Sequence, residues 1–426
     1  MIDSLCTEFP EQASRNPALP MALGGIRIVD FSHFLAGPLA TMILADMGAQ
    51  VIKIEAPERG DDLRQYPPFD ATVGLGAPFA WANRSKSSVA LDLKTPAGRD
   101  LALRLIDQAD VVVENFSTGV MQRLGLDYQT CRQRNARLVY CSVSAYGREG
   151  EFADRLGFDP VAQAESGFVS MNGYADREGV RAASPVMDIS TALMTSNAIL
   201  GALLARERQG FGQFLEVALF DTALMMTGWA PLQHLFSGRD AGRHGNISPD
   251  TSPSGVFQAS DRTFYINCGN SKIFQRLAAE VIDRPDVAVD PRFATPKDRI
   301  AYREELFSLF GEAFARQPWS YWQQRMRRAG VPCGLVRTVA EAIRSPEARD
   351  RAIVSRVRDA SGRWVPNVAL PIRYDRTPLA QHRAAPAVGQ HTRQILSEVL
   401  QLDERELAEL NDAGAFGQAA PVEVSR

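Results

Sequence analysis

The sequence predicts an α/β protein whose larger domain is built on a doubly wound parallel sheet, and two observations lead to this prediction. Short apolar runs rich in β-branched residues, typical of buried strands, alternate with segments of helical periodicity along the first half of the chain. The first of these segments form a strand–helix–strand unit, whose two strands are expected to be parallel with a right-handed crossover.

The first strand is expected at residues 26–31, after two glycines. A helix follows from Pro38, which suits a first helical position, and a second strand ends at Glu55. A dinucleotide-binding domain begins in the same way. Its turn, however, needs the glycines of the G-x-G-x-x-G pattern, and here only Gly37 lies in the turn. Glu55 therefore fits an NAD site, whereas the turn does not.

Strand and helix signals continue to alternate after this unit. In chain order they are a strand at 87–93, a helix at 97–109, a strand at 110–116, a helix at 119–126, a strand at 136–144, a long helix at 189–208, and a strand with an apolar helix within 212–236.

Residues 225–260 are rich in Gly, Ser, Pro and Asp and are predicted to form a long loop at a domain transition. A smaller α+β unit follows, and the chain is expected to close on one amphipathic helix at 396–410. The predicted domains are an N-terminal arm at 1–24, a large domain at 25–225, a linker loop with a small α+β domain at 226–337, and a C-terminal segment at 338–426 that returns to the large domain.

The composition is that of an ordinary soluble globular protein, with 45% hydrophobic residues, 23% charged residues and a net charge of -3. No basic run stands out, so a nucleic-acid partner is not expected. No apolar run approaches the roughly 20 residues of a membrane span, and the first residues lack the features of a signal peptide. Five scattered cysteines suit a reducing compartment. We therefore expect a cytoplasmic protein that binds neither nucleic acid nor membrane.

Candidate catalytic residues are few. His33 lies in the turn after the first strand, and no pattern for a catalytic metal, a nucleophile elbow or a phosphate-binding loop is present. Asp188 stands out because it follows Pro185 at the start of the long helix. It could cap the helix, or it could be a nucleophile held ionised by the helix dipole. Asp159 and Glu165 offer a second carboxylate.

An ordered series of motifs runs through about residues 24–400. The motifs are GIRIVDFSHFLAGPLATMILADMGAQVIKIEAP, GDDLR, NRSKSSVALDLKTPAG, ADVVVENFSTGVMQRLGL, SVSAYG, GFDPVAQAESG, PVMDIS and GVPCGLV. As a set they resemble the class III CoA-transferases, the family of formyl-CoA and carnitine CoA-transferases. The resemblance implies a Rossmann-like large domain whose first turn contacts coenzyme A, a smaller second domain, and an interlaced homodimer.

The resemblance also implies roles for particular residues. Asp188 falls on the catalytic aspartate, whose carboxylate attacks an acyl-CoA donor, with succinyl-CoA as one candidate, to give an aspartyl anhydride and then an aspartyl-CoA thioester. Neither a metal nor a permanently bound cofactor is needed, and coenzyme A arrives as the acyl-CoA substrate. The CoA-binding positions are His33, Phe34, Leu35, Ala36, Arg64, Leu91, Lys94, Asn115, Phe116, Arg123, Leu124 and Tyr146, of which Arg64 and Arg123 would supply charge to phosphates.

Some positions depart from the family pattern, and two alternatives stay open. Leu35 stands where formyl-CoA transferases have a glutamine, which argues against oxalate or formate as the substrate. Ala56 and Ser117 replace basic residues that some members place near the CoA phosphates. A 2-methylacyl-CoA racemase would need two bases, and it carries His-Asp where this chain has Phe158-Asp159. A catalytically silent CoA-binding protein is the other alternative.

Overall fold

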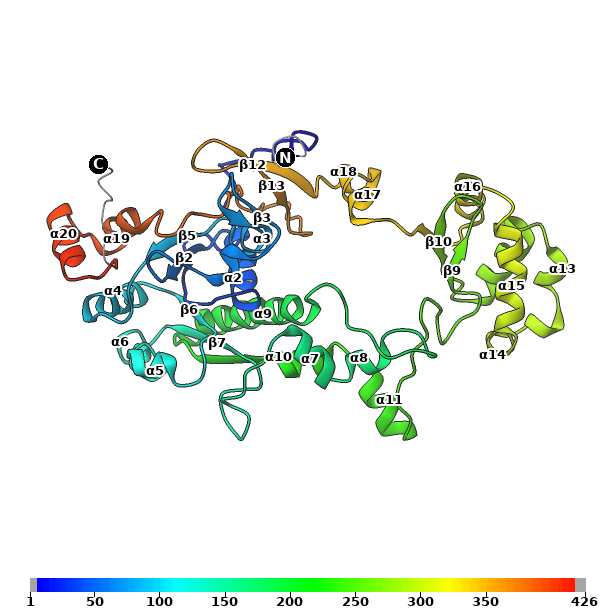
Figure 1. The fold of residues 1–426 in the computed structure, drawn as a ribbon, viewed down its shortest axis with the longest axis horizontal. Helices are drawn as coiled ribbons and strands as arrows, with labels where there is room; N and C mark the ends of the chain where they lie inside the picture. Colours follow the sequence, from blue (N-terminus) through cyan, green and yellow to red (C-terminus); the bar gives the residue numbers. More distant parts are fainter. Residues whose placement is uncertain (1–5, 418–426) are drawn as a thin grey trace, which may run out of the picture. The chain divides into compact units, whose positions relative to one another are not determined.

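The computed structural model describes residues 6–417 of the chain, which fold into two compact units (Figure 1). Unit 1 combines Met1–Phe168, Ala182–Trp229 and Glu347–Arg426, and unit 2 combines Val169–Arg181 with Ala230–Pro346. Residues 169–181, which the sequence-based division counts with the large domain, thus belong to unit 2. Both units are discontinuous in sequence, because the chain enters and leaves unit 2 twice.

A six-stranded parallel sheet forms the core of unit 1. From edge to edge its strands are β5 (Ser87–Ala90), β2 (Gln50–Glu55), β1 (Arg27–Asp30), β6 (Val111–Glu114), β7 (Val139–Ser144) and β8 (Phe214–Ala218). The predicted α/β class with a parallel central sheet is confirmed. The strand order reverses between β1 and β6, and in open α/β sheets ligands bind at the carboxyl ends of the strands that flank such a reversal.

Helices cover both faces of this sheet, because successive residues of each strand point to opposite sides. Ile28, Val111 and Val139 face one apolar layer, whereas Val29 and Val112 face the other. The first layer is closed by α2 (Ala36–Asp46), α3 (Ala77–Asn83) and α9 (Val186–Gln209), and the second by α4 (Pro96–Asp107), α5 (Val120–Leu124), α6 (Tyr128–Arg134), α19 (Thr392–Leu400) and α20 (Glu404–Asp412).

Helix α2 begins at Ala36, two residues before the predicted start at Pro38, and all of its residues are buried. Pro38 lies in the first turn, where its missing N–H group is not needed. Gly37 is required for a different reason from the one that applies in a dinucleotide-binding turn. A Cβ atom at residue 37 would lie 2.4 Å from the Cβ atom of Ser32, so only glycine lets the loop after β1 pack against the helix.

Helix α9 is longer than predicted. By length and composition alone it could cross a membrane, which contradicts the expectation that no apolar run approaches that length. In the structure α9 packs one face against α2, α10 (Leu219–Met225), β7 and β8, whereas Leu193, Met194 and Leu204 are exposed.

The end of the chain also differs from the prediction. The single closing helix is two helices, α19 and α20, because Gln401 adopts a left-handed conformation and Asp403 caps α20 through the N–H group of Glu406.

The sequence did not indicate the β12–β13 hairpin (Val354–Arg358 and Trp364–Val368). The remaining elements of unit 1 are a 3₁₀ turn (Asp62–Gln65), β3 (Phe69–Asp70), β4 (Leu75–Gly76) and α7 (Asp159–Glu165), while α8 (Phe168–Met171) and α18 (Pro346–Asp350) each span a boundary between the units.

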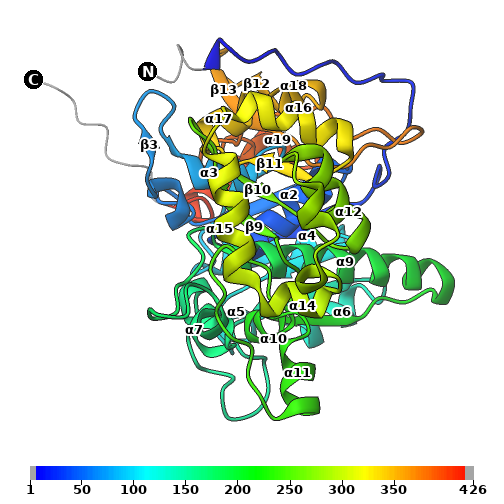
Figure 2. The same ribbon diagram turned by 90° about the vertical axis from the view of Figure 1, so that its right-hand side faces the viewer.

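Unit 2 contains a three-stranded antiparallel sheet, in the order β11-β10-β9, packed on helices (Figure 2). Its core is aromatic, with Phe257, Phe264, Phe314 and Trp322 in mutual contact. The predicted loop at 225–260 contains α11 (Ala230–Ser237) and all of β9 (Gly255–Gln258). Other elements are β10 (Thr263–Ile266), α12 (Ser271–Arg276), a π-helical turn (Leu277–Val281), α13 (Pro285–Ala288), a 3₁₀ turn (Pro291–Phe293), α14 (Pro296–Ala301), α15 (Arg303–Phe314), α16 (Trp319–Ala329), β11 (Cys333–Leu335) and α17 (Val339–Ile343).

Candidate functional site

The loops that follow β1 and β6 are joined at the point where the strand order reverses. The backbone N–H group of His33 donates to Oδ1 of Asn115 at 2.8 Å, and Nδ2 of Asn115 donates to the carbonyl oxygen of His33 at 2.8 Å. The imidazole lies 5.0 Å from the ring of Phe116, measured between centroids. The structure therefore brings together three of the predicted CoA-binding residues.

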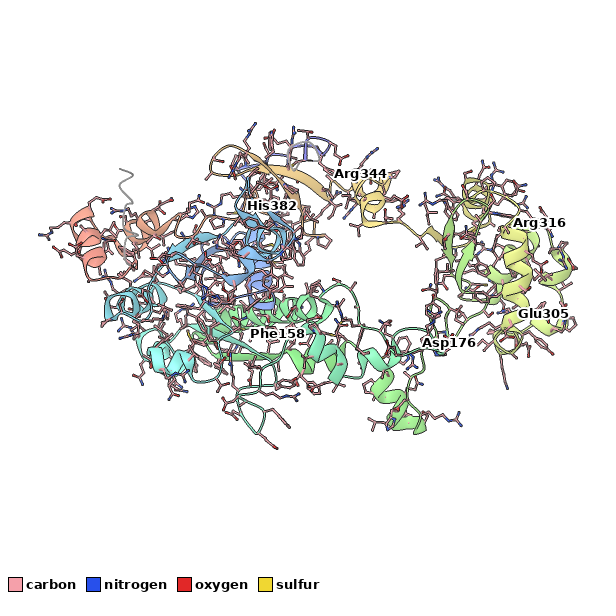
Figure 3. The ribbon with its side chains drawn as sticks, in the orientation of Figure 1. Phe158, Asp176, Glu305, Arg316, Arg344 and His382 are labelled. Carbon is pink, nitrogen blue, oxygen red and sulfur yellow. The ribbon has the colours of Figure 1, made fainter. Side chains whose placement is uncertain are left out.

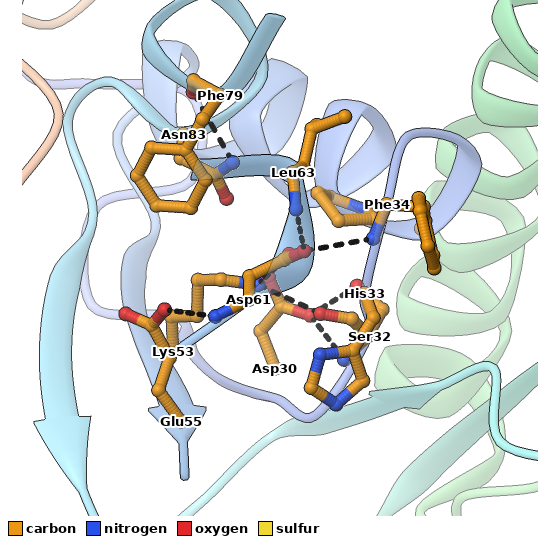
Figure 4. Close-up of polar contacts among 12 residues, drawn as sticks. Asp30, Ser32, His33, Phe34, Lys53, Glu55, Asp61, Leu63, Phe79 and Asn83 are labelled. Atoms are coloured by element: carbon orange, nitrogen blue, oxygen red, sulfur yellow. Dashed lines mark hydrogen bonds and ion pairs between the residues drawn. The ribbon is translucent and has the colours of Figure 1, made fainter. Parts of the chain in front are cut away.

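Asp61 fixes the conformation of the loop after β1 (Figure 4). Phe34 has a φ of 60°, a left-handed conformation that is unusual for a residue with a bulky side chain. Its N–H group donates to Oδ1 of Asp61 at 3.2 Å, and the N–H group of Leu63 donates to the same oxygen at 2.9 Å. The second carboxylate oxygen forms an ion pair with Lys53 at 3.0 Å. Asp61 thus compensates for the strained backbone at Phe34.

A fully buried ion pair lies beneath the same loop. Nζ of Lys86 donates to Oδ2 of Asp30 at 2.9 Å, and the hydroxyl group of Thr41 donates to that oxygen at 2.6 Å. Burial opposes ionisation of Asp30, but Lys86, Lys53 and the hydroxyl groups around it hold its pKa well below the usual range. Burial lowers the pKa of Lys86 to about 8 although Asp30 opposes this shift. The pair is therefore ionised at neutral pH.

The neighbouring His33 is neutral at pH 7. Burial and, to a lesser extent, the charge of Lys53 lower the pKa of this imidazole. His33 can therefore pack against a ligand or form hydrogen bonds to it, but it brings no positive charge to a phosphate group.

Arg64 has a structural role that is inconsistent with the predicted phosphate contact. Its Nε and Nη2 atoms donate to the Glu55 carboxylate at 2.9 and 2.6 Å, Nη1 donates to the carbonyl oxygen of Pro386 at 2.8 Å, and the guanidinium lies 3.8 Å above the ring of Phe79. The side chain is 4% exposed, so it does not reach a ligand on the surface. Glu55 is equally engaged, because it also accepts a hydrogen bond from Ser88 at 2.6 Å.

The other predicted CoA-binding residues fall into three groups. Leu91 and Ala36 are buried in the two apolar layers, and Leu35 and Leu124 are partly buried against them. Lys94 and Arg123 are exposed cations in the part of the chain that the structure describes. Tyr146 lies in the loop after β7, and its hydroxyl group donates to Glu165 of α7 at 2.7 Å.

Asp188 is the third residue of α9 and does not cap this helix, because Pro185 occupies the N-cap position. No described residue donates a hydrogen bond to its carboxylate. Burial, and next the charge of Asp159, raise the pKa of Asp188 to about 7. The position near the helix N-terminus therefore does not keep the pKa of this carboxyl group at its ordinary value, because burial and the neighbouring carboxylate raise it.

Asp159, not Glu165, is the carboxylate next to Asp188. Its Oδ2 atom accepts the N–H groups of Met187 at 2.7 Å and of Asp188 at 3.3 Å. The preceding residue, Phe158, is exposed (Figure 3). Its ring lies edge-on to that of Phe34, with the ring centroids 5.9 Å apart. The start of α9 is thereby connected, through Asp159 and Phe158, to Phe34 in the loop after β1.

Several residues that shape this site were not predicted as functional. Lys53, Lys86, Asp61 and Gln163 are charged or polar and buried, and all four lie within the quoted motifs. For Lys53, the signal that could have revealed it is an ionisable residue inside an otherwise apolar stretch, because such groups are rarely buried without partners. The stretches around the other three residues are polar or mixed and give no such signal.

The described residues contain no group of three or more His, Cys, Asp or Glu side chains that could hold a metal ion. All five cysteines lie in the described part of the chain; none of them forms a disulfide bond there, and four are buried. Burial raises the pKa of the Cys131, Cys141 and Cys268 thiols to about 12, so these three thiols are not nucleophilic at neutral pH.

Comparison with known proteins gives a consistent result. The model of the CoA-transferase family III matches residues 23–392. The chain is 36% identical over 387 residues to the succinate–glutarate CoA-transferase of Agrobacterium fabrum, covering 88% of this chain and 95% of the relative. It is 38% identical over 337 residues to the acetyl-CoA:oxalate CoA-transferase of Acetobacter aceti, covering 79% and 86%.

Solved structures agree with these relatives. The chain resembles the crystal structure of a CAIB/BAIF family protein from Brucella suis with a TM-score of 0.80 and 35% identity, over 89% of this chain and 100% of the other. The crystal structure of Rv3272 from M. tuberculosis matches with a TM-score of 0.77 and 30% identity, over 88% and 99%. The chain therefore belongs to CoA-transferase family III and is a CoA-transferase.

Proposed function

We propose that this enzyme transfers CoA through covalent intermediates on Asp188. The carboxylate oxygen attacks the thioester carbonyl of the donor, the C–S bond breaks, and CoA leaves as a thiolate, so that an aspartyl anhydride forms. The thiolate then attacks the aspartyl carbonyl, which gives an aspartyl-CoA thioester and releases the donor acid. The acceptor carboxylate repeats the two steps in reverse and restores the carboxylate of Asp188.

One observation carries this proposal: the Asp188 side chain is partly buried, its carboxylate receives no hydrogen bond from a described residue, and its pKa is raised to about 7. A carboxylate of higher pKa is a stronger nucleophile when ionised, and one without hydrogen bonds loses less solvation when it attacks. Because one thioester is exchanged for another, the reaction needs neither a metal nor a permanently bound cofactor.

We further infer that unit 1 is Rossmann-like and binds coenzyme A where the strand order reverses. The paired loops at His33 and Asn115 support this location, as does the ring of Phe116 beside them. The exposed cations Lys94 and Arg123 are the proposed phosphate contacts.

The proposed donor is succinyl-CoA, and the proposed acceptor is a short dicarboxylic acid. The names of the relatives support this choice, because several of these names pair succinate or succinyl-CoA with glutarate, citramalate or mesaconate as the second acid. Leu35, at the start of α2, supports an acceptor with a longer carbon chain than oxalate.

We also propose that the enzyme works in the cytoplasm as an interlaced homodimer. Exposed apolar side chains support an additional protein contact in each unit, with Leu224 and Met225 on α10 of unit 1 and Leu235 and Phe236 on α11 of unit 2. Light scattering on the purified protein tests the dimer, and a monomer at micromolar concentration would contradict it.

Mass spectrometry tests the proposed mechanism. The protein is incubated with succinyl-CoA and a panel of carboxylic acids, with and without hydroxylamine. We expect a new acyl-CoA for each accepted acid and a hydroxylamine adduct at Asp188. Exchange of the α-proton of a 2-methylacyl-CoA with solvent deuterium, without any acyl transfer, would support the racemase alternative. Binding of CoA without either reaction would support a silent CoA-binding protein.

The substitution Arg123→Gln is expected to raise KM for succinyl-CoA about tenfold and to leave kcat nearly unchanged, because a lost phosphate contact weakens substrate and transition state alike. Steady-state kinetics at several salt concentrations measure this effect, and the variant should depend less on salt than the wild type. Arg405→Gln, on the exposed surface of α20, is the control. Equal KM values for Arg123→Gln and the control would remove Arg123 from the CoA site.

A further inference from the structure

The first turn of α9 gives Asp188 an unusual position. In a capping box, the carboxylate at the third helical residue accepts the N–H group of the N-cap residue. Asp188 is the third helical residue, but the N-cap residue is Pro185, which has no N–H group. The hydrogen bond that would normally hold this carboxylate against the helix therefore cannot form.

The other N–H groups at the start of α9 have partners elsewhere. Val186 donates to the carbonyl oxygen of Ser184 at 2.8 Å. Met187 and Asp188 both donate to Oδ2 of Asp159, at 2.7 and 3.3 Å. A free helix N-terminus attracts any nearby carboxylate, but here a carboxylate from α7 already occupies it.

Asp159 is itself held in place. Its Oδ1 atom accepts a hydrogen bond from Nε2 of Gln163 at 2.5 Å, one turn further along α7. Oε1 of Gln163 accepts the N–H group of Ala182 at 2.8 Å, in the segment that leads into α9. Both side chains are buried. Helix α7 therefore binds the segment before α9 and the first turn of α9 at the same time.

We infer that Asp159 and Pro185 are positioning residues that keep the carboxylate of Asp188 free of hydrogen bonds from its own helix, so that it stays available to attack the thioester. Asp159 does so by occupying the N–H groups of the first turn, and Pro185 does so by offering none. The inference rests on the proposed function of Asp188, and it gives Asp159 a task that requires no contact with the substrate.

The charge of Asp159 acts in the same direction as its geometry, because it raises the pKa of Asp188. Other charged side chains on the elements packed against α9 do not contribute to this shift: they are Asp46 on α2, Glu165 on α7, Asp221 on α10 and Glu216 on β8. In the described part of the chain, Asp159 is thus the single charge that tunes Asp188.

Two substitutions test the inference by different routes. Asp159→Asn keeps an oxygen that can accept the two N–H groups but removes the charge. Pro185→Ala keeps Asp159 but restores an N–H group at the N-cap, to which the Asp188 carboxylate can bond. Both changes should lower the pKa of Asp188, by about 1 pH unit, so that the acid limb of the kcat/KM profile moves to lower pH. Both should also lower kcat several-fold.

Titration of the Asp188 carboxyl carbon by NMR, assigned with Asp188→Asn, provides a readout that needs no turnover. The control is Asp403→Asn, which alters the capping carboxylate of α20. Two results would overturn the inference. One is an unchanged titration of Asp188 in both folded variants. The other is a decrease in kcat that only parallels the decrease in melting temperature, as in the control variant. If the titration shifts but the wild type transfers no CoA, the positioning stands and the proposed function falls.

Discussion

Replacement of Asp188 by alanine is expected to lower kcat for CoA transfer by about 10⁴-fold or more, because the nucleophile on which both intermediates form is removed. The KM for succinyl-CoA should change little, since the proposed CoA contacts lie on the loops after β1 and β6. Steady-state kinetics measure both parameters, and the hydroxylamine adduct should disappear. Residual transfer within tenfold of the wild type would exclude Asp188 as the nucleophile.

The free energy of unfolding should depend on pH through the same carboxylate. Measuring this dependence also shows whether an inactive variant of Asp188 is folded. Folding raises the pKa of Asp188 from 3.8 to about 7, so the folded state binds this proton more tightly than the unfolded state. The resulting stabilisation is present below pH 3.8 and is lost as the pH rises through 7. Asp188→Asn should therefore be more stable than the wild type at pH 8, by up to about 4 kcal/mol, and the difference should shrink towards pH 5.

Removal of one member of the buried ion pair should have the largest effect on stability. Lys86→Met leaves Asp30 buried without its main cation and is expected to lower the free energy of unfolding by about 3–5 kcal/mol. Urea unfolding at pH 7 measures the change. Arg393→Met is the matched control, because its ion pair with Glu404 is exposed and should contribute less than about 1 kcal/mol. Equal effects of the two substitutions would contradict the proposed role of the pair.

A double variant separates the pair from the individual residues. Asp30→Asn combined with Lys86→Met removes both charges, so no uncompensated ion stays in the interior. The loss of stability should be clearly smaller than the sum of the two single losses. Folding lowers the pKa of Asp30, so its ionised carboxylate stabilises the folded state fully above the ordinary pKa of 3.8. This stabilisation is lost as the pH falls further. The wild type should therefore lose this contribution in acid, and the double variant should not.

The parallel sheet could be predicted because its strands are fully buried. Runs such as Val111–Val113 are apolar on both faces and end at turn residues, so their sequence marks them clearly. The β12–β13 hairpin gave no such signal, since β12 mixes valines with serine and arginine, and β13 includes Pro366 and Asn367. The break at Gln401 was also missed, because a left-handed glutamine differs from its neighbours only in backbone conformation.

The candidate site was predictable in its residues but not in its electrostatics. Asp188 could be chosen from the sequence, yet the sequence suggested an ionised helix-terminal group, because the neighbour that raises its pKa comes from another helix. Arg64 was misjudged for a similar reason. An arginine after a strand is indistinguishable in sequence from a phosphate ligand, and only the fold shows that Glu55 already binds it.

The discontinuous course of the chain has a consequence for biosynthesis. Unit 1 contains residues from both ends of the chain, and its C-terminal part completes interactions begun near the N-terminus. His382 reaches Asp46 at 3.3 Å, and the hydroxyl group of Thr392 accepts the N–H group of Ala90 at the edge of the sheet. During translation, the sheet of unit 1 leaves the ribosome long before these partners exist. The edge strand β5 of the nascent chain therefore lacks these partners until synthesis is almost finished, and an uncovered sheet edge is prone to pair with other chains.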